Sequence, residues 1–320
     1  MSNPFNLLIT SISKKVPLVK TVRQSIVNLN LNIRIFGGDS ASQCVAAYFV
    51  DEFWKMPSLG SLSIEDLVSY CKKNGIKAII PTRDGELAFF SKHEMHLEKE
   101  GIFCLISKPK AIEACMNKLL FYEYLSSFQL PVIQTALSPD SFSCSSYVVK
   151  ECFGAGSCSI GLNLGLSEAK MWSRNLKNPI FQPFIQGEEY SIDLYMTRKN
   201  IFHGVIARVR EFVSNGESQI TRSIENKELE SLCMEAARHL GIYGHAVFQA
   251  LKDKKGKPHL IECNPRFGGA STLSIAMGLH SFEWFLSEIL QIPLPPFVRS
   301  SVEMRQIRYP EDMVLSLEPV

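Results

Sequence analysis

The opening third of the chain alternates short apolar runs with helical patterns, and this order constrains the fold most. Residues 5–10 predict a buried strand, and residues 15–28 predict a helix with Val16, Val19 and Val22 on one side. The pattern continues with strands at 32–36, 78–81 and 103–106, and with a helix at 64–74 that Ser63 can cap. Strands that alternate with helices pair in parallel, so we predict an α/β layer built on a parallel sheet.

The first strand-to-helix turn of this layer carries no dinucleotide-binding signature. Residues 11–15 read Ser-Ile-Ser-Lys-Lys, without the glycines of GxGxxG. The layer is therefore expected to support or bind a small substrate. Arg83, Asp84 and Glu86 follow a predicted strand end, where parallel sheets bind ligands. The same residues could equally cap the next helix, and the sequence leaves both alternatives open.

Length and composition exclude several classes of protein. The chain has 320 residues, more than one typical domain, and a net charge of +2 without a block of like charge. This balance favours neither a nucleic-acid nor a membrane-surface role. No apolar run reaches the roughly 18–20 residues of a membrane span, and no basic residue precedes the first apolar run, as it would in a secretory signal. The nine cysteines show no paired spacing, which predicts a reduced, cytoplasmic compartment.

The rest of the chain predicts a second, mostly antiparallel part. A helix is expected from 108 to about 128, and a strand at 147–150 precedes a glycine-rich loop at 154–161. A hairpin is predicted at 190–196 and 201–209. The remaining expected elements are helices at 227–240 and 271–290, strands at 244–252 and 259–262, and a short strand within 301–308.

The segment 261–269, Ile-Glu-Cys-Asn-Pro-Arg-Phe-Gly-Gly, carries the strongest chemical signal. Residues two apart on a strand point to the same side, so Glu262 and Asn264 project together. A carboxylate and an amide oxygen suit a hard cation such as Mg²⁺. Gln249 on the preceding strand can face the same side, and Arg266 can reach phosphate oxygens. The alternative is a strand end with a capping asparagine and a surface arginine.

Three further segments are weaker signals on their own. Lys150 precedes the glycine-rich loop, whose backbone N–H groups can approach phosphates, although a plain surface loop is the alternative. Residues 181–190 form an apolar strip followed by acids, which suits an adenosine or a strand entering the core. Arg208 and Arg210 share a strand face. With Arg222, they either neutralise an acyl-phosphate, bind a substrate carboxylate or form a solvated basic strand. His203 and His245 are interpreted as structural.

Taken in order, these segments resemble the ATP-grasp superfamily, and most closely single-module proteins similar to the carbamoyl-phosphate synthetase large subunit. The resemblance covers nearly the whole chain, and the metal-strand motif is its most specific part. Its segments are NLLITSISKKVPLVK, IIPTRDGELAFF, NKLLFYEYLSSFQLPV, VVKECFGAGSCSIGL, FQPFIQGEEYSID and VFQALKDKKGKPHLIECNPRFGG. It implies an α/β and α+β chain: a parallel-sheet pre-ATP-grasp domain at 1–112, a linker helix and lid at 113–186, and a larger antiparallel lobe with the metal site and a short tail at 187–320.

The resemblance also implies roles for individual residues. ATP phosphates would contact Lys118, Lys150, Gly154, Gly156 and Ser157. Gln182, Phe184 and Ile185 would line the adenine pocket, and Glu189 would hold the ribose. Gln249, Glu262 and Asn264 would ligate Mg²⁺ or Mn²⁺. Arg266, Arg208 and Arg210 would act in catalysis. The sequence departs from the family pattern at Cys158, where a basic residue is common, and at Glu151, where proline is common.

The implied function is that of an ATP-dependent carboxylate–amine ligase, which forms an acyl-phosphate and releases ADP and phosphate. Carbamoyl phosphate synthesis itself is not expected, because it needs two phosphorylating modules and a glutaminase partner. The alternatives are an ATP-grasp kinase and a non-catalytic ATP-binding module. The expected partners are small, amino-acid-like carboxylate and amine substrates, with no nucleic acid or membrane, and a homodimer as the common default. The sequence does not identify either substrate.

Overall fold

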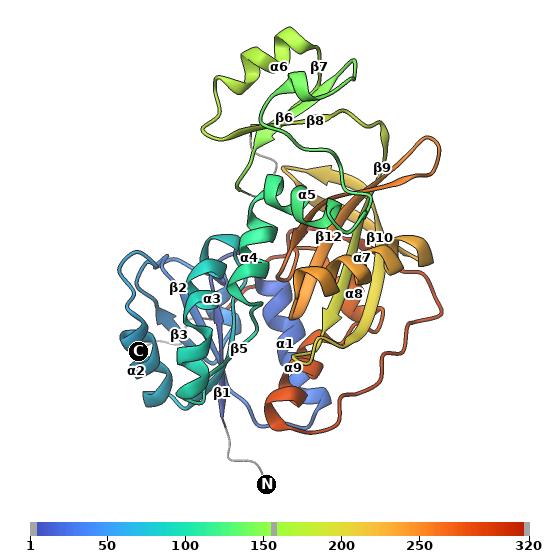
Figure 1. Cartoon of the computed structure of the whole chain (residues 1–320). Helices are drawn as coiled ribbons and strands as arrows, with labels where there is room; N and C mark the ends of the chain where they lie inside the picture. Colours follow the sequence, from blue (N-terminus) through green and yellow to red (C-terminus); the bar gives the residue numbers. More distant parts are fainter. Residues whose placement is uncertain (1–4, 155–158, 317–320) are drawn as a thin grey trace.

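The computed structural model describes residues 5–154 and 159–316. Figure 1 shows three parts: an N-terminal layer in blue and teal, a small green lobe at the top, and a large yellow-to-orange lobe at the right. Each part is built on its own sheet. The parallel N-terminal sheet and the two antiparallel sheets confirm the predicted fold class.

The N-terminal sheet has the order β3-β2-β1-β4-β5, with every pair parallel. Its strands are β1 (Asn6–Thr10), β2 (Ile35–Asp39), β3 (Glu52–Lys55), β4 (Ile76–Ile80) and β5 (Phe103–Cys104). Helix α1 (Val16–Asn28) packs on one face, whereas α2 (Ile64–Lys73) and α3 (Asp84–Lys99) pack on the other. Strands are added to one side of β1 up to β3 and to its other side from β4 onward. The boundary between β1 and β4 is therefore the topological switch point of the sheet.

The small lobe is an antiparallel sheet of order β7-β6-β8 covered by one helix. Its elements are β6 (Tyr147–Glu151), β7 (Gly161–Leu164), α6 (Leu166–Ser173) and β8 (Pro179–Pro183). Its core is small, with Tyr147, Val149, Ala169 and Phe181 buried together.

The large lobe holds an antiparallel sheet of order β13-β12-β9-β10-β11-β14. Its strands are β9 (Gly187–Met196), β10 (Phe202–Ser214), β11 (Glu217–Ile224), β12 (Gly244–Asp253), β13 (Pro258–Asn264) and β14 (Arg305–Ile307). One face packs its apolar side chains against α4 (Pro109–Met116), α5 (Lys118–Ser126) and α7 (Lys227–Leu240). The other face packs on α8 (Ser271–Ala276), on α9 (Ser281–Leu290) and on the N-terminal layer at the end of the sheet away from the small lobe. The part of this face nearer the small lobe is left open (Figure 1).

The structure corrects two predicted helices. The single helix expected at 108–128 is two, because Asn117 leaves helical geometry (φ −110°, ψ 105°) and its side chain caps α5 by accepting from the N–H groups of Leu119 and Leu120. The helix expected at 271–290 is broken around Gly278, which has φ +105°. Short 3₁₀ helices at Val45–Phe49 and Pro139–Ser141, and strands β3 and β11, were also not predicted.

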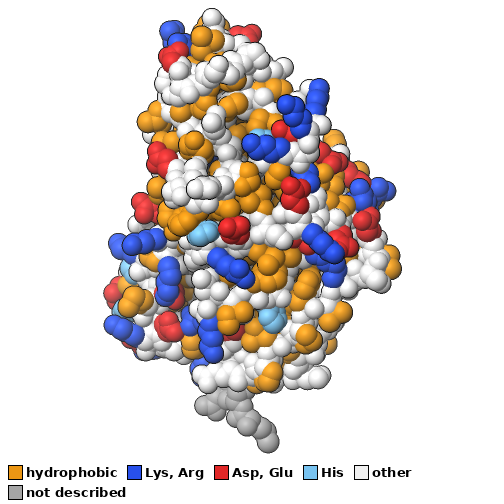
Figure 2. Space-filling view, turned by 45° about the vertical axis from the view of Figure 1, so that its right-hand side comes forward, with side chains coloured by type: hydrophobic (Ala, Val, Ile, Leu, Met, Phe, Trp, Pro, Cys, Tyr) orange, Lys and Arg blue, Asp and Glu red, His pale blue; other side chains and the backbone are white. Residues whose placement is uncertain are grey.

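The surface agrees with the nearly balanced charge. Figure 2 shows Lys and Arg side chains interspersed with Asp and Glu over the face in view, with no field of one sign. None of the helices in the described residues is both long and apolar enough to cross a bilayer.

Candidate nucleotide and metal site

The three predicted metal ligands lie together on the open face of the large sheet. Gln249 on β12 is directly opposite Glu262 on β13, and Asn264 follows two residues later on the same side. The Asn264 amide donates to the Glu262 carboxylate at 3.1 Å. All three side chains are half-buried and line a cleft of about 310 Å³, which we call the metal cleft. The same cleft contains the three predicted catalytic arginines, Arg208, Arg210 and Arg266.

Oxygen ligands in this arrangement fit a hard cation. Glu262 supplies a carboxylate, and Gln249 and Asn264 supply amide oxygens. Within 5–154 and 159–316, no group of three or more His, Cys, Asp or Glu side chains is placed to hold a metal ion. The carboxylate of Glu262 with the two amide oxygens suits Mg²⁺, which takes part of its coordination from nucleotide phosphates and water.

Two buried lysines approach this site from the side of the small lobe. Lys118 is the first residue of α5, and its ammonium group donates to the Gly154 carbonyl at 2.8 Å. Lys150 on β6 is 7% exposed. Burial is the main cause that lowers the pKa of Lys150, and the charge of Lys118 adds to it, whereas the charges of Glu262 and Glu189 oppose both. The resulting pKa is about 8. The site therefore holds two cations next to the Glu262 carboxylate.

The structure describes only part of the glycine-rich loop. Gly154 lies beside Lys118, Glu262 and Asn264 at a small hollow. Gly156 and Ser157, the other predicted phosphate contacts, lie outside the described residues, as does Cys158. Glu151 accepts from the backbone N–H groups of Lys177 and Asn178, so this departure from the family pattern stabilises the turn before β8.

The predicted adenine residues lie apart from the metal cleft. Gln182 is buried on β8 and donates to the Thr135 hydroxyl at 2.8 Å. Phe184 and Ile185 follow in the connection to β9, and the Phe184 N–H donates to the Ser146 carbonyl. None of the three lines the metal cleft. They form the link between the small and large lobes.

Arg210 connects several of the predicted residues. Its guanidinium donates to Glu189 at 2.6 Å, to Gln249 at 3.3 Å and to Ser218 at 3.0 Å. The predicted ribose ligand Glu189 is therefore part of the same polar face as the metal ligands.

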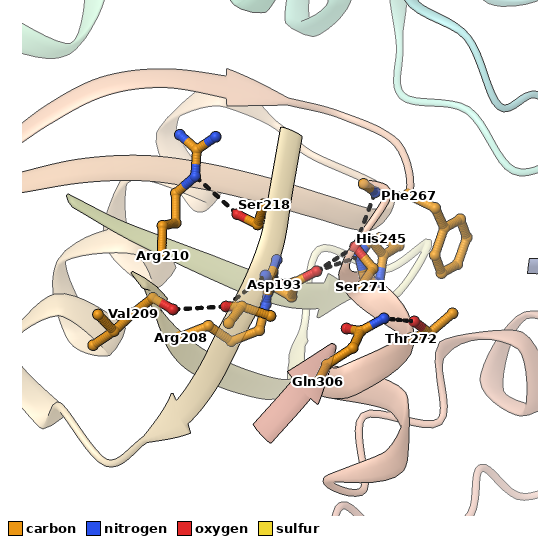
Figure 3. A network of polar contacts seen from close by, with 12 residues as sticks. Asp193, Arg208, Val209, Arg210, Ser218, His245, Phe267, Ser271, Thr272 and Gln306 are labelled. Carbon is orange, nitrogen blue, oxygen red and sulfur yellow. Dashed lines mark hydrogen bonds and ion pairs between the residues drawn. The ribbon is translucent and has the colours of Figure 1, made fainter. Parts of the chain in front are cut away.

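Arg208 is held by a buried network that the sequence did not reveal (Figure 3). Its guanidinium donates to Asp193 at 2.7 Å, and Asp193 also contacts His245 at 3.1 Å and accepts from Ser271. Burial favours a raised pKa for Asp193, but the Arg208 charge and the His245 and Ser271 hydrogen bonds outweigh it and hold the pKa below its usual range. Arg208 is only 2% exposed, so Asp193 fixes its position at the cleft floor.

The N-terminal layer closes the metal cleft on one side. The Arg266 guanidinium makes a forked ion pair with Asp84, with a 2.6 Å bond from its Nε, and also donates to the Phe267 carbonyl. Lys15, Thr82 and Arg83 from the ends of β1 and β4 complete this wall. Asp84 was one of the residues singled out in the sequence, whereas Lys15 was not.

Two family models match the chain. Residues 7–105 match a model described as the PylC-like N-terminal domain, and residues 175–310 match one described as "ATP-grasp in the biosynthetic pathway with Ter operon". Together the two matches span most of the chain. No curated protein sequence gives a significant match.

Solved structures share the fold at low sequence identity. The biotin carboxylase domain of Hydrogenobacter thermophilus 2-oxoglutarate carboxylase, crystallised as a dimer with MgADP and bicarbonate, is 15% identical with a TM-score of 0.76, over 95% of this chain and 74% of that one. L-amino acid ligase from Bacillus licheniformis is 19% identical with a TM-score of 0.70, over 91% and 75%. N5-carboxyaminoimidazole synthetase from Staphylococcus aureus with ADP is 14% identical with a TM-score of 0.70, over 92% and 79%. On the two family matches, the chain carries an ATP-grasp domain behind a PylC-like N-terminal domain, and the fold shared with the solved structures agrees with both assignments.

Proposed function

We propose that the protein is an ATP-dependent carboxylate–amine ligase. The observation that carries this proposal is the convergence of Gln249, Glu262 and Asn264 with three arginines in one cleft. Oxygen ligands and guanidinium groups together can hold a nucleotide's terminal phosphate and the carboxylate that receives it. The ligase and synthetase named among the similar structures support the same class of reaction.

The nucleotide is proposed to lie between the two lobes. Lys118, Lys150 and the loop at Gly154 would contact its phosphates, the link at 182–185 would take the adenine, and Glu189 the ribose. A divalent cation bound at Gln249, Glu262 and Asn264 would offset charge on the transferring phosphoryl group. We also propose that 1–112, 113–186 and 187–320 act as layer, linker with lid, and catalytic lobe, although α4 and α5 pack on the large lobe.

The proposed reaction has two steps. The terminal phosphoryl group moves to a carboxylate oxygen of the substrate, which releases ADP and leaves an acyl-phosphate. An amine then attacks the acyl carbon, so the C–N bond forms while the C–O bond to phosphate breaks, and the amine gives up a proton. Arg266, Arg208 and Arg210 face the negative charge that develops in both steps.

An ADP-release screen over pairs of small carboxylates and amines, with product masses, tests this proposal. We expect ADP and phosphate in equal amounts with an amide product. A stable phosphorylated product without an amide would indicate a kinase. Nucleotide binding without ADP release from any pair would indicate a binding module.

A homodimer is proposed as well, and the solution mass measured by light scattering checks it.

Lys150 predicts a pH dependence of nucleotide binding. Its pKa is about 8, below its usual 10.5, so it is charged below pH 8 and loses its proton above that pH. Phosphates favour the charged form, so binding above pH 8 takes up a proton. We expect the ADP affinity to fall by up to about 10-fold per pH unit above pH 8. Calorimetric titration of MgADP in two buffers with different ionisation enthalpies measures both the affinity and the number of protons taken up on binding.

Lys150→Arg is the matched variant for this test, because arginine stays charged at every pH used. Its ADP affinity should vary much less with pH. A wild-type affinity that stays constant from pH 7 to pH 9.5 would show that Lys150 does not contact the nucleotide.

A further inference from the structure

A second cleft adjoins the metal cleft and lies between the N-terminal layer and the large lobe. It has a volume of about 480 Å³, and we call it the junction cleft. One wall comes from the ends of β1, β2 and β4, and the other from Gly268, Gly269, α8 and α9. The residues that line both clefts are Lys15, Arg83, Glu217, Gly268, Gly269 and Arg308. A molecule in the junction cleft would therefore reach the metal cleft without crossing protein.

The position of this cleft in the sheet favours a ligand. The turns after β1 and β4 lie on either side of the switch point, where open α/β sheets bind their ligands. These turns are tied together, because the Thr82 hydroxyl donates to the carbonyls of Thr10 and Ser11, and the Ser11 hydroxyl donates to Glu86. The turns beside the junction cleft are therefore held in place by hydrogen bonds within the N-terminal layer.

The charges around the junction cleft favour an anionic group. Four cationic side chains, Lys14, Lys15, Arg83 and Arg308, face two carboxylates, Asp39 and Glu217. Asp39 already accepts from the backbone N–H groups of Ser13 and Ala41, and Glu217 is paired with Arg308 at 2.5 Å.

Lys15 has the most informative position of these cations. It is half-buried at the border of the two clefts, and no described carboxylate lies within ion-pair distance of its ammonium group. Burial lowers the pKa of Lys15, and the charges of Arg266 and Arg308 add to this effect, whereas the charges of Glu217 and Asp84 partly oppose it. An anion bound beside Lys15 would compensate both.

Part of the lining of the junction cleft is apolar. Pro17 and Leu18 line it from α1, and Ile275 and Phe282 from α8 and α9. These side chains suit a hydrocarbon chain.

We propose that the junction cleft binds the amine substrate, an α-amino acid with an apolar side chain, and that Lys15 holds its carboxylate. An α-amino acid carries the amine and the carboxylate on one carbon. Both groups can therefore lie at the border, with the amine toward the metal cleft, while the side chain lies along Leu18 and Ile275. This inference rests on the proposed ligase function, because the amine must meet an acyl-phosphate made next to Glu262.

The test compares wild type with Lys15→Met, Lys15→Arg and Lys20→Met. Lys20 is exposed on α1, which begins directly after Lys15, and it lines neither cleft, so Lys20→Met is the matched control. The probes are L-alanine, L-valine, L-leucine, L-methionine and L-phenylalanine. Each is compared with its decarboxylated amine, which lacks the carboxylate. O-phosphoethanolamine is a phosphorylated amine and tests whether the site takes a phosphate in place of a carboxylate. ADP release gives kcat and KM, and calorimetry in the presence of MgADP gives binding.

We expect wild type to use at least one of these amino acids in preference to its decarboxylated amine. Lys15→Met should raise the KM for that amino acid by about 10- to 100-fold, because a charge-assisted contact is lost. The KM for the decarboxylated amine should change much less, because that amine has no carboxylate for Lys15 to hold. Lys15→Arg should recover part of the loss, and Lys20→Met should behave as wild type.

Three results would overturn the proposal. They are an unchanged KM in Lys15→Met, a preference of wild type for the decarboxylated amines or for the phosphorylated amine, and the absence of binding by every amino acid probe. The ligase proposal fails separately, if the amino acids bind through Lys15 but no carboxylate partner yields ADP.

Discussion

Replacement of Glu262 by glutamine is expected to lower ADP release by roughly 10³-fold while the fold is retained. Glu262 is the only carboxylate among the three proposed metal ligands, and glutamine keeps its shape but removes its charge. The cation would then be held by amide oxygens alone next to the ammonium groups of Lys118 and Lys150. Steady-state ADP release at saturating Mg²⁺, beside the thermal midpoint of the variant, measures both parts of this prediction.

The folded state should tolerate this change, because the Glu262 side chain is half-buried and accepts a hydrogen bond from the amide of Asn264, which glutamine can also accept. Glu235→Gln is the matched control, since Glu235 is exposed on α7, which covers the face of the large sheet opposite the metal cleft. Its ADP release should equal that of wild type. Near-normal ADP release by Glu262→Gln would remove the metal assignment and, with it, the main support for the proposed chemistry.

Elements with strong local signals could be predicted from the sequence. Helix α7 occupies the predicted residues 227–240, because Asn226 caps its start and Gly241, at φ +69°, ends it. The hairpin of β9 and β10 was predicted from its turn, where Asn200 adopts φ +56°. In both cases the residues that determine the structure are neighbours in the chain.

Elements that depend on distant contacts could not be predicted. A Cβ at Gly278 would lie 2.1 Å from the Val298 carbonyl oxygen, so the break between α8 and α9 reflects a close approach of the later chain. Strand β11 alternates polar and apolar residues only weakly, and it forms because it pairs with β10 and β14. Such partners are absent from any local pattern.

The same distinction holds for the site. Glu262 and Asn264 share a side because strand side chains alternate, which makes their grouping predictable. The partner of Arg266 is Asp84, which lies 182 residues earlier in the chain, and Lys15 reaches the same wall from the turn before α1. Likewise, the position of Asp193 next to Arg208 depends on the register of β9 against β10. No spacing within the sequence reports these three placements.

Asp193→Ala is expected to destabilise the protein by about 3–5 kcal/mol, because it leaves the Arg208 charge buried without a partner. It also removes an acceptor from His245 and Ser271 in the same network. The midpoint and slope of urea unfolding, followed by tryptophan fluorescence, measure the loss, since Trp284 packs against Tyr195 two residues further along β9. Asp140→Ala, which breaks an exposed ion pair with Lys170 in the small lobe, should leave the midpoint nearly unchanged.

The double variant Asp193→Ala/Arg208→Met separates the two physical contributions. If the loss comes from an uncompensated charge, removing the arginine as well should restore much of the stability, because methionine can fill the buried volume without a charge. If the double variant is as unstable as the sum of the two single variants, packing and not charge dominates. The restored protein should still lack activity in the ADP-release assay, since Arg208 is proposed to face the acyl-phosphate. A stable and fully active double variant would mean that the Asp193 network stabilises the large lobe only and that Arg208 has no part in the reaction.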